Sequence, residues 1–256
     1  MKTKLYTSAL LVSLTTICFA GETCSKSSPV HTIALLELYT SEGCDSCPPA
    51  DKAVQQLQVI TGLTSDEVIP IALHVNYWDY IGWKDPYAQV LHTQRQQDLA
   101  RLSHARGVYT PGFFINGHEL QNWRTDLIND IKNINQQPAL ANVRLSVSNV
   151  TQRLLQVETE SSSQQAGVFH VVLIENSLVS NVKAGENKDA VLRHDAVVRS
   201  WANSIKLMPG IKHKESVELV IPTQSNRKKL AVVGFIENQN GEVMQSLLLP
   251  FCNPQN

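Results

Sequence analysis

Residues His31–Ile60 read HTIALLELYTSEGCDSCPPADKAVQQLQVI, and this stretch decides the fold prediction. Its first nine residues are mostly apolar, as in a buried strand, and the polar segment that follows is a loop ending at Cys44. Two prolines at positions 48 and 49 suit the first turn of a helix, because the N–H groups that proline lacks have no partner there. Apolar residues then recur at helical spacing as far as Ile60. The predicted order is therefore strand, loop, Cys-x-x-Cys pair and helix.

The segments after this stretch continue the alternation of strands and helices. Residues 68–75 form an apolar run typical of a strand, and residues 86–106 form an amphipathic stretch typical of a helix. Asn116-Gly117 between two apolar triplets is a strong signal for a two-residue hairpin turn, and residues 125–134 complete the unit with a helix. The order β, α, β, α, β, β, α with a dithiol at the start of the first helix is typical of thioredoxin topology. We therefore expect an α/β thioredoxin-like domain over residues 28–137.

The second half of the chain has a different pattern. From Pro138 onwards, apolar residues alternate with polar ones and no long helical pattern appears. The expected strands cover residues 143–147, 154–159, 168–174, 217–221, 230–236 and 243–249. We therefore expect an all-β domain over residues 138–256, arranged as an antiparallel sandwich.

The N-terminal residues have the features of a secretory signal peptide. Lys2 and Lys4 precede the mostly apolar run Leu5–Phe19, and small residues at positions 18 and 20 suit cleavage after Ala20. The run is shorter than the ~20 apolar residues that a membrane span needs. We therefore predict a signal peptide over residues 1–20, no membrane span, and a secreted or periplasmic location.

Charge narrows the class of partner. The 256 residues contain 22 Lys and Arg against 23 Asp and Glu, without a basic block. Nucleic acid binding needs clustered Lys and Arg to neutralise phosphates. We therefore expect no nucleic-acid partner and favour a protein or small molecule that carries a thiol or disulfide.

Four cysteines remain after removal of the predicted signal peptide, and they divide into two pairs. Cys24 and Cys252 lie at opposite ends of the mature chain, so a bridge between them would close a very long loop and act as a structural disulfide. Cys44 and Cys47 form the Cys-x-x-Cys pair. An alternative is that Cys24 or Cys252 exchanges with this pair, since connectivity does not follow from spacing.

The Cys44–Cys47 pair has three interpretations: a redox dithiol, a metal half-site and a structural disulfide. A helix N-terminus stabilises a thiolate, so Cys44 is the expected nucleophile and Cys47 the resolving thiol. Zinc normally takes four ligands, and the sequence offers no second pair. Cys44, Cys47 and His74 together would suit Cu(I). We favour an exported thiol–disulfide oxidoreductase without a cofactor; the alternative is a non-catalytic copper- or protein-binding module.

Five further residues are candidates for this site. Thr110 and Pro111 begin the third strand, where thioredoxin-like proteins place a cis-proline that faces the dithiol and binds the substrate backbone. Tyr77 and Trp78 offer an aromatic platform for a substrate, or else pack the two domains together. Glu37, on the strand before the loop, is a candidate proton acceptor for the resolving thiol, or else an ordinary interface residue.

A polar segment in the second half has no obvious role in the sandwich. Gly185–Asn187 and His194 bring together an acid, an amide and an imidazole. These groups suit a metal site or a position beside the dithiol, and they equally suit a polar network that fixes a long connection between strands.

Several of these runs resemble a known family. They are Leu36–Asp51, His74–Pro86, Tyr109–Pro111 with Asn116-Gly117, Gly185–Asn187 and Leu192–Arg199. Together they resemble a secreted thioredoxin-like family of unknown function, domain of unknown function 1223, over nearly the whole mature chain. The resemblance implies a thioredoxin-like fold and export, and it implies no established substrate.

Overall fold

Three sheets contain the strands of the chain in a computed structural model that describes residues 24–105 and 107–253. The largest sheet is mixed and follows the order β15 (Val243–Pro250), β14 (Leu230–Asn238), β8 (Gly167–Glu175), β11 (Val197–Trp201), β3 (Val68–His74), β2 (Ala34–Thr40), β4 (Gly112–Ile115) and β5 (His118–Glu119), with β12 (Ile205–Leu207) also paired to β8. The second sheet is antiparallel and follows the order β1 (Ser25–Ser27), β6 (Ala141–Val150), β7 (Leu154–Ser163) and β13 (Lys212–Val220). The third is a hairpin of β9 (Leu178–Asn181) and β10 (Val191–His194).

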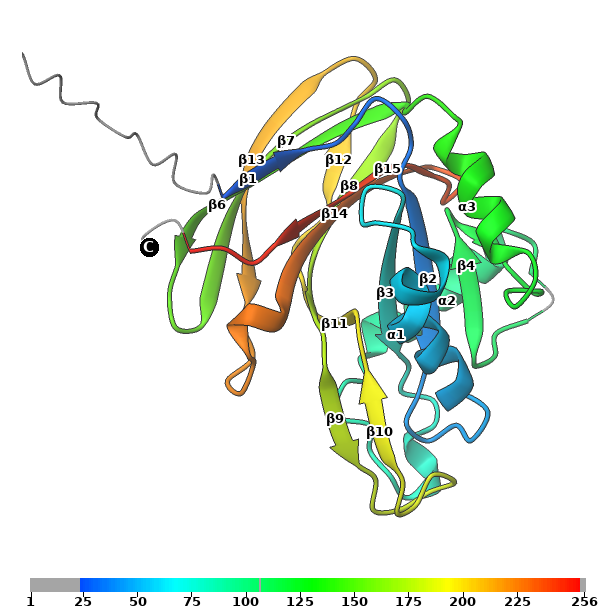
Figure 1. Ribbon diagram of the computed structural model, residues 1–256. Coiled ribbons are helices and arrows are strands. Elements are labelled where there is room, and N and C mark those ends of the chain that lie inside the picture. The colour runs from blue at the N-terminus through cyan, green and yellow to red at the C-terminus, as the bar shows by residue number, and fades with distance from the viewer. Residues whose placement is uncertain (1–23, 106, 254–256) are drawn as a thin grey trace, which may run out of the picture.

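The helices lie at one end of this arrangement. They are α1 (Pro48–Thr61), α2 (Val90–Leu102) and α3 (Leu127–Asn135), with short 3-10 turns at Asp79–Ile81 and Arg227–Lys229. Figure 1 shows the helices around the β2, β3 and β4 part of the large sheet, whereas the four-stranded sheet covers its β8, β14 and β15 part. The hairpin β9–β10 projects from the body, and β10 packs beside α1.

β8 and β14 of the large sheet lie between two hydrophobic cores. Along β14, Val233 and Phe235 belong to the core shared with β2 and β3, whereas Val232 and Ile236 belong to the core against the four-stranded sheet. Successive side chains of a strand point to opposite faces, so this alternation places β14 between two hydrophobic layers. β8 alternates in the same way. One sheet therefore serves both cores.

The expected fold class, an α/β thioredoxin-like domain followed by an antiparallel sandwich-like domain, is wrong. The structure is mostly β, with 42% strand and 18% helix, and its large sheet is mixed. The elements of the first half do not close a sheet of their own, because the Ala72 N–H donates to the Ala196 carbonyl (2.8 Å) and Val197 pairs in parallel with Ala72. Through this pairing β11 continues the sheet into β8, β14 and β15.

The predictions of individual turns and strands agree with the structure better than the prediction of how they assemble. The Asn116-Gly117 hairpin is confirmed, because β4 and β5 pair on either side of it and both turn residues have positive φ. The six strands expected in the second half are also present. The domain boundary at residue 138 stays a prediction, and the predicted signal peptide lies outside the described residues.

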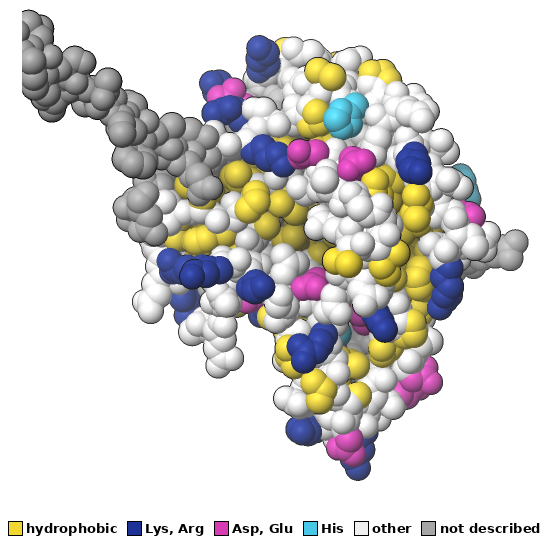
Figure 2. Space-filling view, in the orientation of Figure 1, with side chains coloured by type: hydrophobic (Ala, Val, Ile, Leu, Met, Phe, Trp, Pro, Cys, Tyr) yellow, Lys and Arg dark blue, Asp and Glu magenta, His cyan; other side chains and the backbone are white. Residues whose placement is uncertain are grey.

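The visible surface carries a mixture of charges. Figure 2 shows Lys and Arg side chains interspersed with Asp and Glu, as expected for a chain whose charges nearly balance. In residues 24–105 and 107–253, no helix has the length and apolar character required to span a bilayer.

Candidate functional site

Cys44 and Cys47 form a disulfide at the start of α1. Their sulfur atoms are 2.12 Å apart and their Cα atoms 5.4 Å apart. The turn closes through the Cys47 N–H, which donates to the Cys44 carbonyl, and the N–H groups of Ala50 and Asp51 then donate to the Cys47 carbonyl. Cys47 thus caps the helix that Pro48 begins. The first N–H groups of a helix favour a thiolate, so the turn suits thiol chemistry.

The disulfide is covered, since both cysteines are 0% exposed. The loop between β9 and β10 contributes to the cover. Nδ2 of Asn187 donates to the carbonyl oxygens of Glu42 and Cys44, each at 2.9 Å, and the Asp45 N–H donates to Oε2 of Glu186 at 3.1 Å. The segment Gly185–Asn187 therefore binds residues 42–47, here called the cysteine turn, directly. It lies about 140 positions further along the chain.

A buried pair of carboxylates and a histidine adjoin the cysteine turn. Nε2 of His194 lies 3.2 Å from Oε1 of Glu42, and Nδ1 of His194 lies 3.8 Å from Oδ2 of Asp51. Burial by itself lowers the pKa of His194, but Asp51 and Glu42 outweigh burial and raise it to about 9. The imidazole is therefore positively charged at neutral pH. Asp51 follows Cys47 by one helical turn, so its carboxylate and the Cys47 side chain share one face of the turn.

A second buried histidine–carboxylate pair, His74 with Asp85, lies next to the pair of His194 with Glu42. Nδ1 of His74 lies 2.7 Å from Oδ2 of Asp85, which also accepts the backbone N–H of Glu42 at 2.9 Å. Burial raises the pKa of Asp85, but His74 and backbone N–H groups outweigh it and lower that pKa. The rings of His74 and His194 meet edge to face at 4.8 Å between centroids. The two pairs thus form one polar cluster behind the cysteine turn.

Glu37 lies elsewhere. Its carboxylate accepts two hydrogen bonds of 2.7 Å from Arg95, and the Tyr39 hydroxyl donates to it at 2.8 Å. By contrast, Oγ1 of Thr40 donates to Asp51 of α1. Positions 37 and 40 have opposite parity on β2, so their side chains point to opposite faces of the sheet. The structure does not bring the expected proton acceptor Glu37 to the disulfide. The buried carboxylates of the segment around the cysteines are instead Glu42 and Asp51, which both lie against His194.

The expected substrate-binding residues lie around Trp78. Nε1 of Trp78 donates to Oγ1 of Thr110 at 2.7 Å, and Thr110 joins Pro111 through a cis peptide bond. A Cβ at Gly43 would lie 3.0 Å from Cβ of Trp78, so this glycine permits close approach of the cysteine turn. Trp78 therefore connects the turn before Cys44 with the segment Thr110-Pro111. Tyr77 is half-buried, and its hydroxyl donates to Gln96 of α2.

The other two cysteines of the described residues are joined as well. Cys24 and Cys252 form a disulfide with 5.7 Å between their Cα atoms and 228 positions between them in the sequence. Both residues pack against the core between the two large sheets. In this structure neither contacts Cys44 or Cys47 as a disulfide partner.

Both thiols and one imidazole nitrogen of the residues considered for copper are engaged in other contacts. Both thiols are in the disulfide, and Nδ1 of His74 is bound to Asp85. Nε2 of His74 is buried and has no hydrogen-bond partner within the described part of the chain. The described residues contain no group of three or more His, Cys, Asp and Glu side chains arranged to hold a metal ion.

Comparison with known proteins identifies the family. The model of a family of proteins of unknown function, DUF1223, matches residues 35–237. The chain belongs to the DUF1223 family. No curated protein sequence matches it.

One solved structure supports the fold of this DUF1223 protein. The crystal structure of a protein from Agrobacterium tumefaciens is similar over 90% of this chain and 99% of that chain, with 24% identity and a TM-score of 0.62. That likeness concerns the fold alone. A β-glucosidase from Kluyveromyces marxianus matches 43% of this chain and 14% of its own, with 12% identity and a TM-score of 0.24, too low to indicate a common fold.

The sequence pattern did not reveal the polar cluster of the DUF1223 site in full. His194 and Gly185–Asn187 stand out in the sequence as a polar segment, and the structure places them against the turn that carries the disulfide. Glu42 and Asp51 were missed. Their signal is their position: one is two residues before Cys44, and the other is four residues after Cys47 on the helix that the cysteine begins.

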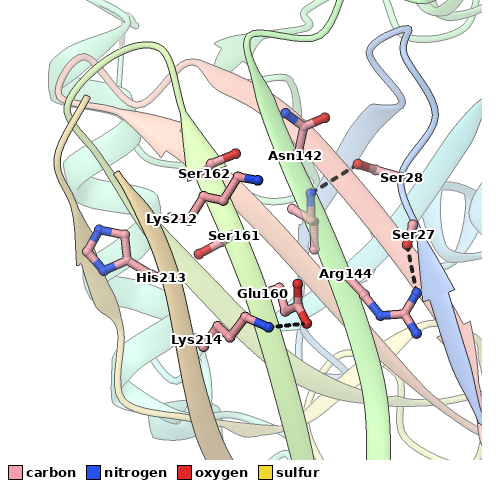
Figure 3. Close-up of a pocket in the computed structure, with 11 residues that line it drawn as sticks. Ser27, Ser28, Asn142, Arg144, Glu160, Ser161, Ser162, Lys212, His213 and Lys214 are labelled. Atoms are coloured by element: carbon pink, nitrogen blue, oxygen red, sulfur yellow. Dashed lines mark hydrogen bonds and ion pairs between the residues drawn. The ribbon is translucent and has the colours of Figure 1, made fainter. Parts of the chain in front are cut away.

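A depression of about 290 Å³ lies on the four-stranded sheet (Figure 3) and contains none of these groups. Nζ of Lys214 pairs with Glu160 at 2.9 Å, and Nη1 of Arg144 donates to Oγ of Ser27 at 3.2 Å. Cross-strand contacts of this kind satisfy the charges on a sheet surface. We therefore place the candidate site at the disulfide and not in this depression.

Proposed function

We propose that this DUF1223 protein is an exported thiol–disulfide oxidoreductase that uses Cys44 and Cys47. The observation that supports the proposal is the Cys44–Cys47 disulfide at the N-terminus of α1, adjoined by the buried groups Glu42, Asp51 and His194. Disulfide exchange requires a thiolate, which a helix N-terminus stabilises, and an acid–base group nearby can take up the proton that the thiol loses. The partner is a protein or small molecule that carries a thiol or a disulfide.

In the reducing direction, the Cys44 thiolate attacks one sulfur of the substrate disulfide, and the other substrate sulfur leaves as a thiolate. Cys47 then loses its proton and attacks Sγ of Cys44. The substrate departs as a dithiol and the Cys44–Cys47 disulfide returns, so two electrons pass to the substrate. The same steps reversed oxidise a substrate dithiol.

Asp51 is the proposed proton acceptor for Cys47. It is buried, lies one helical turn after Cys47, and faces the cationic His194. A carboxylate in this position can act as a general base for the resolving thiol. This assignment replaces Glu37, whose carboxylate is engaged by Arg95.

A substrate needs access to the covered sulfur atoms. The contacts of Asn187 and Glu186 with the cysteine turn are few and polar, so they can exchange for hydrogen bonds to water when the loop moves. Movement of Gly185–Asn187 would open a path bordered by Trp78 and the segment Thr110-Pro111. We propose that these residues contact the substrate chain.

The test is catalysis of insulin reduction together with the reduction potential of the Cys44–Cys47 couple. Wild type should accelerate insulin reduction by a small thiol, Cys44→Ser should not, and the matched control Cys24→Ser/Cys252→Ser should retain the activity. A potential below about −300 mV without turnover would identify a structural disulfide and contradict the proposal.

A further inference from the structure

A cavity of about 680 Å³ lies between α2 and the strands β8, β11 and β14, and neither cysteine of the disulfide lines it. One wall is formed by α2. The other carries His170 of β8, Trp201 of β11, Glu237 of β14 and Ser204 from the segment that follows β11. The volume falls within the range of about 300–1,000 Å³ that is typical of small-molecule sites.

Ser204, His170 and Glu237 form a chain of two hydrogen bonds. Oγ of Ser204 lies 2.8 Å from Nδ1 of His170, and Nε2 of His170 lies 3.1 Å from Oε1 of Glu237. Ser204 is exposed, whereas His170 is buried. A hydroxyl, an imidazole and a carboxylate in this order are the parts of an activated serine nucleophile.

The carboxylate determines which imidazole nitrogen acts as the base. Burial raises the pKa of Glu237, but Arg95 and His170 outweigh burial and lower it to about 2, so the carboxylate is ionised. An ionised carboxylate only accepts hydrogen bonds, and Nε2 of His170 therefore carries the proton. In the neutral ring Nδ1 is then unprotonated and accepts the hydroxyl proton of Ser204.

Neighbouring side chains fix the orientation of Glu237 and His170 in this hydrogen-bonded chain. Nη2 of Arg95 donates to Oε2 of Glu237 at 3.0 Å, and the same guanidinium is anchored by Glu37. The His170 ring stacks on Phe235 at 4.9 Å between centroids and meets Trp201 edge to face at 5.5 Å. A general base must be oriented in advance to be effective, and these contacts fix both the carboxylate and the ring.

We propose that Ser204, His170 and Glu237 form a second, hydrolytic site that cleaves small carboxylic esters. Ser204 and His170 are the catalytic residues, and Glu237 is a positioning residue that acts through His170. The site goes beyond the proposed thiol chemistry and does not depend on it.

The reaction balances without a cofactor. Oγ of Ser204 bonds to the acyl carbon while its proton passes to Nδ1 of His170. The ester C–O bond breaks, and the leaving alcohol takes that proton from Nδ1. Water then attacks the acyl-serine, gives a proton to Ser204 through His170, and releases the carboxylic acid.

The lining of the cavity suits an ester with a short acyl chain. Leu91, Leu102 and Trp201 offer apolar surface for the chain. Arg95 lines the same cavity and carries a positive charge, which favours the oxyanion formed when Ser204 attacks. The rim also carries the ion pair of Asp98 with Arg101.

The first experiment treats the mature protein with a fluorophosphonate probe and locates the modified residue by mass spectrometry. We expect stoichiometric modification of Ser204. Ser204 is exposed, so Ser204→Ala should fold as wild type does and should lose the modification completely. Ser216→Ala is the matched control, because Ser216 is also exposed and its hydroxyl donates to a carboxylate, Glu158, instead of lying against a histidine. Absence of modification in wild type, or modification of another serine alone, would overturn the proposal.

The second experiment measures hydrolysis of p-nitrophenyl butyrate. We expect Ser204→Ala and His170→Asn to lower kcat/KM by at least about a hundredfold, with Ser216→Ala unchanged. Glu237→Gln should lower kcat with little change in KM, which a loss of cavity shape alone would not produce. If His170→Asn fails to fold, the hydrolysis rate of Ser204→Ala alone tests the hydrolytic site. Equal hydrolysis by Ser204→Ala and wild type would contradict the hydrolytic site, while leaving the insulin assay of the cysteine pair unaffected.

Discussion

Nε2 of His194 lies 3.2 Å from Oε1 of Glu42, although the two residues are 152 positions apart in the sequence. This contact ties the hairpin β9–β10 to the turn that precedes Cys44. With Asp51 at 3.8 Å on the other side of the ring, the imidazole lies between two buried carboxylates. The arrangement makes the charge on His194 part of the stability of the site.

We expect the stability supplied by His194 to be lost in alkaline solution. Its pKa is raised from 6.5 to about 9 in the folded protein, so the folded state binds the proton more tightly than the unfolded state does. The contribution is fully present below pH 6.5 and disappears as the pH rises through about 9. It amounts to about 3 kcal/mol.

Urea unfolding at pH 6 and pH 9.5 measures this contribution. Wild type should lose more free energy of unfolding between the two pH values than His194→Gln does. His118→Gln is the control, since His118 is exposed on β5. An identical pH dependence in wild type and His194→Gln would show that the two carboxylates do not hold the charge on His194.

Asn187 should control how fast the Cys44–Cys47 disulfide is reduced. Its side chain donates to two carbonyl oxygens of the cysteine turn, and both sulfur atoms are covered. Asn187→Ala removes both hydrogen bonds, so the loop should open more often and a small thiol should reach the sulfur sooner. We expect reduction by dithiothreitol to be at least about tenfold faster, which corresponds to about 1.4 kcal/mol of lost loop contacts.

Alkylation and mass spectrometry at timed intervals follow this reduction. Lys188→Ala alters the next residue of the same loop, whose side chain is exposed, and should leave the rate unchanged. If Asn187→Ala is reduced at the wild-type rate, movement of this loop does not limit access to the disulfide.

Asp51 and Glu37 should differ in their effect on the resolving step. Asparagine at position 51 cannot take the proton of Cys47, so Asp51→Asn should slow resolution of a mixed disulfide by about a hundredfold at neutral pH. Glu37→Gln should lower stability by weakening the contact with Arg95 while leaving the resolution rate near that of wild type. Quenched-flow measurement of the mixed disulfide separates the two effects. Equal slowing in both variants would remove Asp51 from its proposed role.

The sequence predicts the elements around the site better than their assembly. The helix that begins after Cys47 follows from Pro48-Pro49 and from apolar spacing, and the hairpin follows from Asn116-Gly117. These signals are local, because proline and glycine restrict or relax the backbone where they stand. The junction of the two halves depends instead on Val197 pairing with Ala72. The sequence of neither strand indicates which strand it pairs with.

The misassigned carboxylate has an equally physical cause. Glu37 and Thr40 are three positions apart on β2, so they face opposite sides of the sheet, and only Thr40 contacts α1. The pattern of β2 gives no alternation from which its faces can be told, because every residue from Ala34 to Thr40 is buried. A strand buried on both faces reads as a continuous apolar run. β8 and β14 also contain continuous apolar runs, and these runs were the feature of the sequence that indicated strands packed between two cores.

The Cys24–Cys252 disulfide should supply stability without affecting thiol exchange. It closes a loop of 228 residues, and restricting the unfolded chain in this way stabilises the folded state by about 5 kcal/mol. Cys24→Ser/Cys252→Ser should lower the free energy of unfolding by about this amount, while insulin reduction at a temperature where the variant stays folded should match wild type. Denaturant unfolding and the insulin assay on the same preparations check both expectations. Loss of insulin reduction in a folded double variant would show that the terminal pair takes part in exchange with Cys44 and Cys47.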